Sequence, residues 1–433
     1  MSNKPLKIGL VGAGHRGILY TRYAAKHSDK VKIWAIADPN DYRRNQVAKE
    51  FNIPSENVFS DADALAKSNV ELDAVINGTM DQYHIQTTLP LLERGWDVLL
   101  EKPICTNEQD LNTLYEAANK NQCKVMVCHV LRYAPFYVAV KKLLLDGEIG
   151  DILTINTEEN VSYHHIAVAF IRGRWRNKDI CGSPILMAKC CHDLDLITWF
   201  MSGVAPSKVA SFGSLMHFKP EKAPEGSGKR CLVDCKIERE CPYSAYNNYI
   251  EKGLWGPYAW ESVEHHGDAL TKEIKIESLK QDNPYGRCVW HCDNNVVDHQ
   301  TVIIEFQNGV TATHTLTGAT SKPSRTVHII GTKGEIEGNM SDGTLVLRKP
   351  DLKIEYTEKI IDIDVKGDGH GGGDARLTDD FISVMSGEQP SISTTSLEDS
   401  LYGHMIGFEA DRAMNESTIA KIPEFMKKRG NNE

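Results

Sequence analysis

A lysine follows an apolar segment at a position typical of ligand-binding residues in α/β proteins. Lys102 belongs to Glu101-Lys102-Pro103, which comes directly after the apolar run Val98-Leu99-Leu100. If that run is a buried parallel strand, Lys102 stands at its carboxyl end, where open α/β sheets bind their ligands. A lysine ammonium there can hold a hydroxyl group or move a proton, so we expect Lys102 to take part in chemistry.

A glycine-rich segment precedes this lysine by about 85 residues and has the spacing of a dinucleotide-binding loop. Gly12-Ala13-Gly14-His15-Arg16-Gly17 lies between an apolar strand expected over Leu6 to Val11 and a following helix. The first glycine permits a tight turn, the second lets the main chain approach a pyrophosphate, and the third lets the helix pack closely. Because N–H groups at a helix N-terminus bind phosphate, we expect cofactor contacts from Gly12, Ala13, Gly14, His15 and Arg16.

An acidic residue follows the second expected strand, about 20 residues beyond the glycine loop. A carboxylate at Asp38 would accept hydrogen bonds from ribose hydroxyls and repel a 2′-phosphate, which favours NAD over NADP. Arg43 and Arg44 lie close by and could accommodate that phosphate, so NADP stays the alternative. A turn role for Asp38, just before Pro39, is the other interpretation.

Two further strand ends carry polar or sulfur-containing side chains. Thr79-Met80 follows the strand expected over Ala74 to Gly78, and His84 would open the next helix. Helix capping or packing would explain these residues equally well. On the dinucleotide interpretation, the cofactor contacts expected at the strand ends are Thr79, Met80, His84, Glu101 and Lys102.

The pattern of elements changes near residue 130. Residues 6–128 alternate short apolar strands with helices, which predicts a Rossmann domain with a doubly wound parallel sheet over 1–130. From Tyr133 onward, strands with period-two alternation are separated by turn residues, as in Gln307-Asn308-Gly309. These features predict a second domain over 131–433 with a mostly antiparallel sheet. An aromatic- and cysteine-containing stretch at about 219–290 is interpreted as an insertion.

The order of these motifs resembles the Gfo/Idh/MocA oxidoreductases, the glucose-fructose oxidoreductase and inositol dehydrogenase family. The resemblance rests on the glycine loop, the strand-end aspartate, Thr79 with His84, Glu-Lys-Pro, His192, and the loop Gly369-His370-Gly371-Gly372-Gly373-Asp374. It implies a Rossmann domain followed by an α/β substrate-binding and oligomerisation domain over 131–433 with a large open sheet. It also implies bound NAD(P) and hydride chemistry on sugars or polyols. Lys102 matches the family's catalytic lysine.

The second catalytic element of that family is an Asp-x-x-x-His pair on a helix, and here it is incomplete. His192 matches the histidine, but Ala188 replaces the aspartate. We expect His192 to be the main acid/base and Lys102 to polarise the reacting hydroxyl, although His192 could instead be a packing residue. Lys189 and Asp195 would share a helix face with His192.

Another segment with substrate-binding composition lies upstream of that helix. Tyr163-His164-His165 and Arg172-Gly173-Arg174-Trp175-Arg176 occupy the region that borders nicotinamide and substrate in the family. Aromatic faces and hydrogen-bond donors suit a sugar, but surface arginines are also common. The substrate contacts expected from both segments are Tyr163, His165, Arg172, Trp175, Lys189 and Asp195.

Cysteines in the insertion suggest a metal site. Cys231, Cys235 and Cys241 are followed about 50 residues later by Cys288. Four thiolates could hold a structural zinc ion in a tetrahedron, although the spacing is not that of a standard zinc knuckle. Reduced buried thiols and a disulfide are the alternatives.

The composition limits the classes of partner. The chain has 433 residues, 41% of them hydrophobic and 25% charged, and a formal net charge of -10. Dispersed lysines and arginines argue against nucleic acid and anionic membranes as partners, and the sequence has neither a signal-peptide pattern nor an apolar run of spanning length. We therefore expect a cytoplasmic protein with a small-molecule carbohydrate substrate. By analogy with the family, we expect a homo-oligomer, dimer or tetramer.

These observations predict an NAD-dependent oxidoreductase. It would transfer a hydride between nicotinamide and a hydroxyl-bearing carbon of a sugar, sugar derivative or polyol. The missing aspartate keeps open a redox-neutral, NAD-dependent enzyme that cleaves glycosides through a transient keto-sugar. A non-catalytic NAD or sugar sensor is a third hypothesis.

Overall fold

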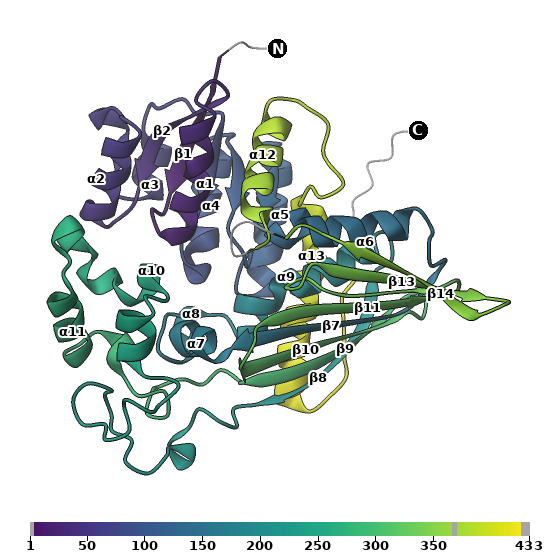
Figure 1. Ribbon diagram of the computed structural model, residues 1–433. Coiled ribbons are helices and arrows are strands. Elements are labelled where there is room, and N and C mark those ends of the chain that lie inside the picture. Colours follow the sequence, from purple (N-terminus) through teal and green to yellow (C-terminus); the bar gives the residue numbers. More distant parts are fainter. Residues whose placement is uncertain (1–3, 366–369, 426–433) are drawn as a thin grey trace.

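Two β-sheets organise the chain (Figure 1). The computed structural model describes residues 4–365 and 370–425, so Gly369 of the second-domain loop lies outside the described residues. None of the helices within these ranges has the length and apolar composition needed to cross a lipid bilayer.

The first sheet is the predicted Rossmann sheet. Its six strands are parallel, in the order β3-β2-β1-β4-β5-β6. They are β1 (Leu6–Val11), β2 (Val31–Ala37), β3 (Val58–Phe59), β4 (Ala74–Asn77), β5 (Asp97–Leu100) and β6 (Val125–Val127). The central strand β4 is buried throughout, as expected when helices cover both faces of a parallel sheet.

Five helices connect these strands, and three of them begin at a side-chain cap. The helices are α1 (His15–Lys26), α2 (Asp41–Glu50), α3 (Ala62–Lys67), α4 (His84–Glu93) and α5 (Glu108–Asn121). Asn40, Asp61 and Asn107 accept hydrogen bonds from main-chain N–H groups in the first turns of α2, α3 and α5. Such caps satisfy N–H groups that have no partner within the helix and so determine where each helix starts.

The second sheet has nine strands and is mostly antiparallel, as predicted. Its order is β14-β13-β12-β11-β7-β10-β9-β8-β15, and within it β7 and β10 pair in parallel. The strands are β7 (Ile152–Ser162), β8 (Pro206–Ser214), β9 (His299–Phe306), β10 (Thr311–Thr320), β11 (Ser324–Gly331), β12 (Glu335–Asn339), β13 (Thr344–Asp351), β14 (Glu355–Asp362) and β15 (Ala420–Lys421). The β7–β10 pair is parallel, and the other strand pairs of this sheet are antiparallel.

Helices α9 (Ile185–Phe200) and α13 (Leu397–Glu416) pack on each other and against this sheet. In Figure 1, α13 crosses behind the strands. All residues of α9 except Lys189 and Thr198 are buried, so this helix is enclosed on every side. Polar residues inside such a helix must be paired or functional, because unpaired buried polar groups are costly.

The chain returns to the first domain near its end. Helix α12 (Gly373–Met385) lies beside α1 in Figure 1. Its residues Leu377 and Phe381 belong to the same buried cluster as Ile8 and Leu10 of β1. The core of the Rossmann domain is thus not confined to 1–130, because α12 presents an apolar face that this core covers.

The predicted insertion lies between the paired strands β8 and β9. It contains α10 (Gly256–Ala259), a 3-10 segment (Glu261–Ala269) and α11 (Lys272–Lys280). Figure 1 shows α10 and α11 below the Rossmann domain and to the left of the second sheet. Helix α6 (Pro135–Leu145) connects the first sheet to the second, while α7 (Tyr163–Ile166) and α8 (Lys178–Cys181) lie between β7 and β8.

Candidate active site

The glycine loop has the geometry that a dinucleotide requires. Gly12 has φ +85°, and a Cβ there would lie 2.8 Å from the main chain of Gly78 and Thr79. A Cβ on Gly17 would lie 2.2 Å from the carbonyl oxygen of Gly12, so both glycines are needed for close packing. Beside Gly14 the nearest atom would be 4.0 Å away, and α1 begins there without a side-chain cap. The first N–H groups of α1 therefore fit a pyrophosphate.

Asp38 links this loop to the end of β2. It is 5% exposed, and its Oδ2 accepts a hydrogen bond from the Ala13 main-chain N–H at 2.6 Å. Its Oδ1 accepts one from the Asn40 main-chain N–H at 2.7 Å. Each oxygen keeps lone-pair capacity for a ribose hydroxyl, so a turn role and a ribose-binding role are compatible.

Arg16 and Glu101 form a partly buried ion pair that connects the glycine loop to the end of β5. Arg16 Nε lies 2.8 Å from Glu101 Oε1, and the Tyr20 hydroxyl donates to the same oxygen at 2.6 Å. Arg16 also pairs with Asp374 at the start of α12. Burial opposes ionisation of Glu101, but Arg16 and Lys102 outweigh it and lower the pKa of this carboxyl. Arg16 and Glu101 thus position other groups, and Glu101 Oε2 accepts from the Lys102 main-chain N–H at 2.9 Å.

Lys102 reaches from β5 to helix α9 of the second domain. Its Nζ donates to the carbonyl oxygen of Ala188 at 2.8 Å, so the residue that replaces the expected aspartate still anchors the lysine. Burial alone would lower the pKa of Lys102, but Cys191, Glu101 and Asp81 raise it above its ordinary value. The side chain is therefore an ammonium at neutral pH, with further N–H donors for a hydroxyl group.

The contacts of His84 favour the packing interpretation. Its ring is fully buried, with Nδ1 2.7 Å from the Pro103 carbonyl oxygen and Nε2 3.0 Å from that of Thr79. Both nitrogens thus contact the main chain of the two strand-end loops. His84 holds these loops together, while Thr79 bonds Asn77 and Met80 Sδ contacts Arg174.

His192 lies in α9 close to Lys102. It is 4% exposed, and its Nδ1 has no hydrogen-bond partner among the described residues. Its ring centroid is 5.8 Å from those of His129 and His370. Burial, followed by the charge of Lys102, lowers the pKa of His192 well below its ordinary value. The imidazole is therefore neutral at physiological pH and able to accept a proton.

Asp195, proposed from helix spacing to lie beside His192, is paired with another element of the fold. Its carboxylate accepts two hydrogen bonds from Arg132, at 2.7 and 2.6 Å, and the residue is fully buried. The nearest histidine is His129, whose Nε2 is 3.7 Å from Asp195 Oδ1. His129 thus lies between His192 and Asp195, a relationship that only the fold reveals.

Arg172 is likewise turned away from the expected substrate region. Its guanidinium donates to Arg287 O at 2.6 Å, Tyr249 Oη at 3.1 Å and Tyr243 O at 2.7 Å. It is 1% exposed, so it braces the interior of the insertion. A buried arginine satisfied in this way has no donor directed at a sugar.

Two other predicted substrate residues are held by carboxylates. The Trp175 indole N–H donates to Asp81 Oδ2 at 3.0 Å, which ties the second domain to the loop after β4. Lys189 Nζ lies 3.1 Å from Glu159 Oε1 of β7. Both side chains remain partly exposed, so they can border a ligand as well as stabilise the fold.

The insertion supplies aromatic residues that the sequence did not identify. Trp255 lies 4.4 Å from His165 between ring centroids, at 30° between planes, and donates its N–H to His164 Nδ1 at 2.9 Å. Tyr258 has its ring 6.1 Å from His15 of the glycine loop. Burial raises the pKa of Tyr258, while Lys102 and Arg16 act in the opposite direction, which indicates that its hydroxyl lies near both charges. The sequence feature that could have indicated these residues is the density of aromatic residues within an otherwise weakly periodic insertion.

Tyr163 is also close to the insertion. Its hydroxyl accepts a hydrogen bond from Lys252 Nζ at 3.3 Å, and its ring lies 6.1 Å from that of Tyr243. Together, Tyr163, His165 and the insertion aromatics form a wall of rings on the second-domain side of the site. Such rings can stack on the apolar face of a sugar.

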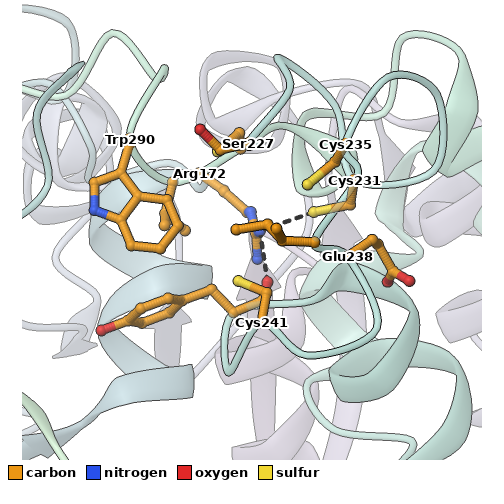
Figure 2. Close-up of a pocket in the computed structure, with 11 residues that line it drawn as sticks. Arg172, Ser227, Cys231, Cys235, Glu238, Cys241 and Trp290 are labelled. Carbon is orange, nitrogen blue, oxygen red and sulfur yellow. Dashed lines mark hydrogen bonds between the residues drawn. The ribbon is translucent and has the colours of Figure 1, made fainter. Parts of the chain in front are cut away.

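The cysteines of the insertion do not form a preassembled zinc site. Cys231, Cys235, Cys241 and Cys288 line one small cavity together with Arg172 (Figure 2). All four are free thiols, and no three of these described sulfur atoms lie within 4.8 Å of one another. Burial raises the pKa of Cys288 to about 11 and also raises that of Cys241. The arrangement of two buried and two partly buried free thiols does not support the predicted metal centre.

Buried histidines make the stability of the fold dependent on pH. Burial lowers the pKa of His129, His192 and His314, and lowers that of His404 to about 3. Below pH 6.5 the unfolded chain binds protons that these folded side chains do not, so stability falls as pH falls. Each such histidine contributes a loss of about 2 kcal/mol at pH 5.

We therefore expect the free energy of unfolding, measured by urea denaturation, to decrease steadily between pH 7 and pH 5. A His404→Gln variant should lose about 2 kcal/mol less than the wild type over this range. The exposed pair His265 and His266, replaced by glutamine, serves as the control and should leave the pH dependence unchanged. A wild-type free energy that is the same at pH 7 and pH 5 would contradict this prediction.

Comparisons with known proteins agree with this geometry. Residues 6–129 match the model of an oxidoreductase family, NAD-binding Rossmann fold, and residues 141–422 match that of its C-terminal alpha/beta domain. The oxidoreductase YteT of Bacillus subtilis (strain 168) is 26% identical over 344 residues, which are 76% of this chain and 75% of YteT. Inositol 2-dehydrogenase of Corynebacterium glutamicum (strain R) is 27% identical over 48% of this chain and 57% of its own length.

Solved structures share the fold. Levoglucosan dehydrogenase, in complex with NADH and levoglucosan, has a TM-score of 0.69 at 18% identity and covers 97% of this chain and 100% of its own. The apo scyllo-inositol dehydrogenase from Lactobacillus casei has a TM-score of 0.64 at 18% identity, covering 98% of this chain and 99% of its own. At these identities, the likeness concerns the fold alone.

Proposed function

Because the chain belongs to the Gfo/Idh/MocA oxidoreductase family, we propose that it is an NAD-dependent dehydrogenase of a sugar, sugar derivative or polyol. One observation carries the proposal. An ammonium at Lys102 and a neutral imidazole at His192 lie together beside a loop that fits a dinucleotide. A charged donor beside a neutral base is what removal of a hydride and a proton from an alcohol requires.

The cofactor side of the reaction depends on binding and orientation. The first N–H groups of α1 would hold the pyrophosphate, and the Asp38 carboxylate would accept hydrogen bonds from the adenosine ribose. When bound, the nicotinamide supplies the hydride acceptor. The partly buried pair of Arg16 and Glu101 fixes Lys102 relative to this loop, so binding and chemistry share one rigid network.

Two residues, Lys102 and His192, would act on the substrate. Lys102 would donate a hydrogen bond to the reacting hydroxyl and stabilise negative charge on its oxygen, while His192 takes the hydroxyl proton. His192 works without an aspartate one turn earlier, since that position is Ala188. Burial keeps its imidazole unprotonated before the reaction.

A polyhydroxylated substrate is supported by the surroundings. The stacked rings of His165 and Trp255 offer an apolar surface, and Lys189 and Trp175 provide polar groups nearby. The relatives named inositol 2-dehydrogenase and levoglucosan dehydrogenase act on compounds of this kind by their names.

The proposal is tested by incubating the purified protein with NAD and a panel of polyols, free sugars and glycosides. We expect NADH formation with at least one free or anhydro sugar or polyol, and none without substrate. Release of an aglycone with no net NADH would instead point to redox-neutral glycoside cleavage. NAD binding without turnover on any member of the panel would count against an enzyme.

A His192→Asn variant provides a sharper test of the acid/base role. Turnover should fall by about 10²-fold, because a positioned proton acceptor is lost, while NADH affinity stays unchanged. The control His265→Asn changes an exposed histidine of the insertion and should retain wild-type turnover. Equal turnover in His192→Asn and wild type would remove His192 from the reaction.

A further inference from the structure

The insertion of the second domain reaches the region where the adenosine ribose would bind. Arg43, in the first turn of α2, pairs with two glutamates of the insertion. Its Nε lies 2.6 Å from Glu264 Oε1, and one Nη lies 2.6 Å from Glu261 Oε1. The Asn40 amide donates to Glu264 Oε1 at 3.2 Å. Two carboxylates from beyond residue 219 thus meet the segment that directly follows Asp38.

These contacts occupy a side chain that could otherwise recognise a phosphate. An arginine near the end of the second Rossmann strand can accommodate the 2′-phosphate of NADP, using its planar set of N–H donors. In Arg43, the donors on Nε and on one Nη already point at carboxylates. The neighbouring Arg44 is engaged as well, since it contacts Asp41 and the carbonyl oxygen of Asp38.

The two glutamates are themselves held in position. Arg174 Nε donates to Glu261 Oε2 at 3.0 Å, while one of its Nη groups contacts Met80 Sδ at 3.1 Å. The 3-10 segment also packs on α2, since a Cβ on Gly267 would lie 3.3 Å from the hydroxyl of Tyr42. The carboxylates therefore belong to a built contact between the insertion and the Rossmann domain.

The local charge is unfavourable for an additional phosphate. The carboxylates of Asp38, Glu261 and Glu264 outnumber the guanidiniums of Arg43 and Arg174 by one, and Arg44 is matched by Asp41. A dianionic 2′-phosphate would meet this excess at short range, where charges near a protein surface still interact strongly. A ribose with two hydroxyls brings no such charge.

We infer that Glu261 and Glu264 of the insertion select NAD over NADP by pairing with Arg43. This inference rests on the proposed function, because it assigns a role within the same dinucleotide site. Cofactor selectivity would then depend on Asp38 and also on residues that lie more than 200 positions later in the chain. The insertion acts there as a specificity element of the first domain.

The test measures dissociation constants of NADH and NADPH for the full-length protein by nicotinamide fluorescence. In the double variant Glu261→Gln and Glu264→Gln, the affinity for NADPH relative to NADH should rise about tenfold, since Arg43 is released and two negative charges are removed. Adding Arg43→Ala to the double variant should abolish most of this gain. The control Glu251→Gln removes a carboxylate from an exposed pair with Lys272 in the same insertion and should leave the ratio unchanged.

The possible outcomes separate this inference from the proposed function. An unchanged NADPH to NADH ratio in a double variant that binds NADH normally overturns the role of the glutamates. A gain that persists after Arg43→Ala overturns the role of Arg43. If the double variant does not fold, as judged by circular dichroism, Glu264→Gln alone should raise the ratio, and no rise there overturns the inference. Failure of the wild type to bind either nucleotide contradicts the proposed function itself.

Discussion

A Lys102→Met variant should bind NADH like the wild type but lose turnover by about 10³-fold or more. Methionine keeps much of the length of the side chain and removes the charge and the N–H donors. The Lys102 ammonium is positioned by Ala188 O at 2.8 Å and kept protonated by its anionic neighbours. Its loss removes the group that would stabilise negative charge on the substrate oxygen, whereas the glycine loop and Asp38 are untouched.

The measurement combines steady-state rates on the best substrate with an NADH titration by fluorescence. Lys252→Met is a matched control, since Lys252 is an exposed lysine of the insertion that contacts the Tyr163 hydroxyl rather than the reaction centre. It should change the Michaelis constant at most and leave turnover within a fewfold of the wild type. Wild-type turnover in Lys102→Met would contradict the catalytic role of this lysine.

The second large effect concerns stability. An Asp195→Asn variant should lose about 3–5 kcal/mol of free energy of unfolding, because the buried Arg132 guanidinium is left without its carboxylate. The pair is bidentate, at 2.7 and 2.6 Å, and joins the loop after β6 to α9. Burial raises the pKa of Asp195 even though Arg132 opposes this, which shows how strongly the surroundings disfavour an isolated charge there.

Urea denaturation at pH 7 measures this loss. A double variant, Arg132→Met with Asp195→Leu, should recover most of the stability, since apolar residues of similar volume can replace a buried ion pair. Glu305→Gln breaks an exposed pair with Lys208 and should leave the denaturation midpoint unchanged. An Asp195→Asn midpoint equal to that of the wild type would show that the pair contributes nothing to folding.

The Rossmann sheet and its dinucleotide loop could be predicted because their signals are local. Alternation of apolar strands and helices, together with the spacing of Gly12, Gly14 and Gly17, depends on residues within one βαβ unit. Strands β12 and β14 were not predicted. In β14 most residues are exposed. An edge strand without a buried face shows little alternation of apolar and polar residues, which is the pattern that predicts a strand.

Candidate site residues could be proposed from the sequence where a single strand end or helix contains them, as for Lys102 and His192. The partners of His84, Arg172 and Asp195 could not be predicted in this way. Helix spacing correctly places Asp195 near His192 along α9, but it cannot reveal that Arg132 approaches from another element. The contacts of Glu261 with Arg43 escaped prediction for the same reason, because they join residues 218 positions apart.

The return of α12 to the first domain has a consequence for how this protein folds. Leu377 and Phe381 complete the core around Ile8 and Leu10, and Arg16 pairs with Asp374 at the start of the same helix. During synthesis, the ribosome completes residues 1–130 long before it adds Leu377 and Phe381. Until then, part of the apolar core of the N-terminal domain is exposed to solvent. Contacts of such long sequence separation slow folding. The surroundings of the glycine loop are therefore completed only after residues 374–381 of α12 have been made, which couples the cofactor site to the synthesis of the second domain.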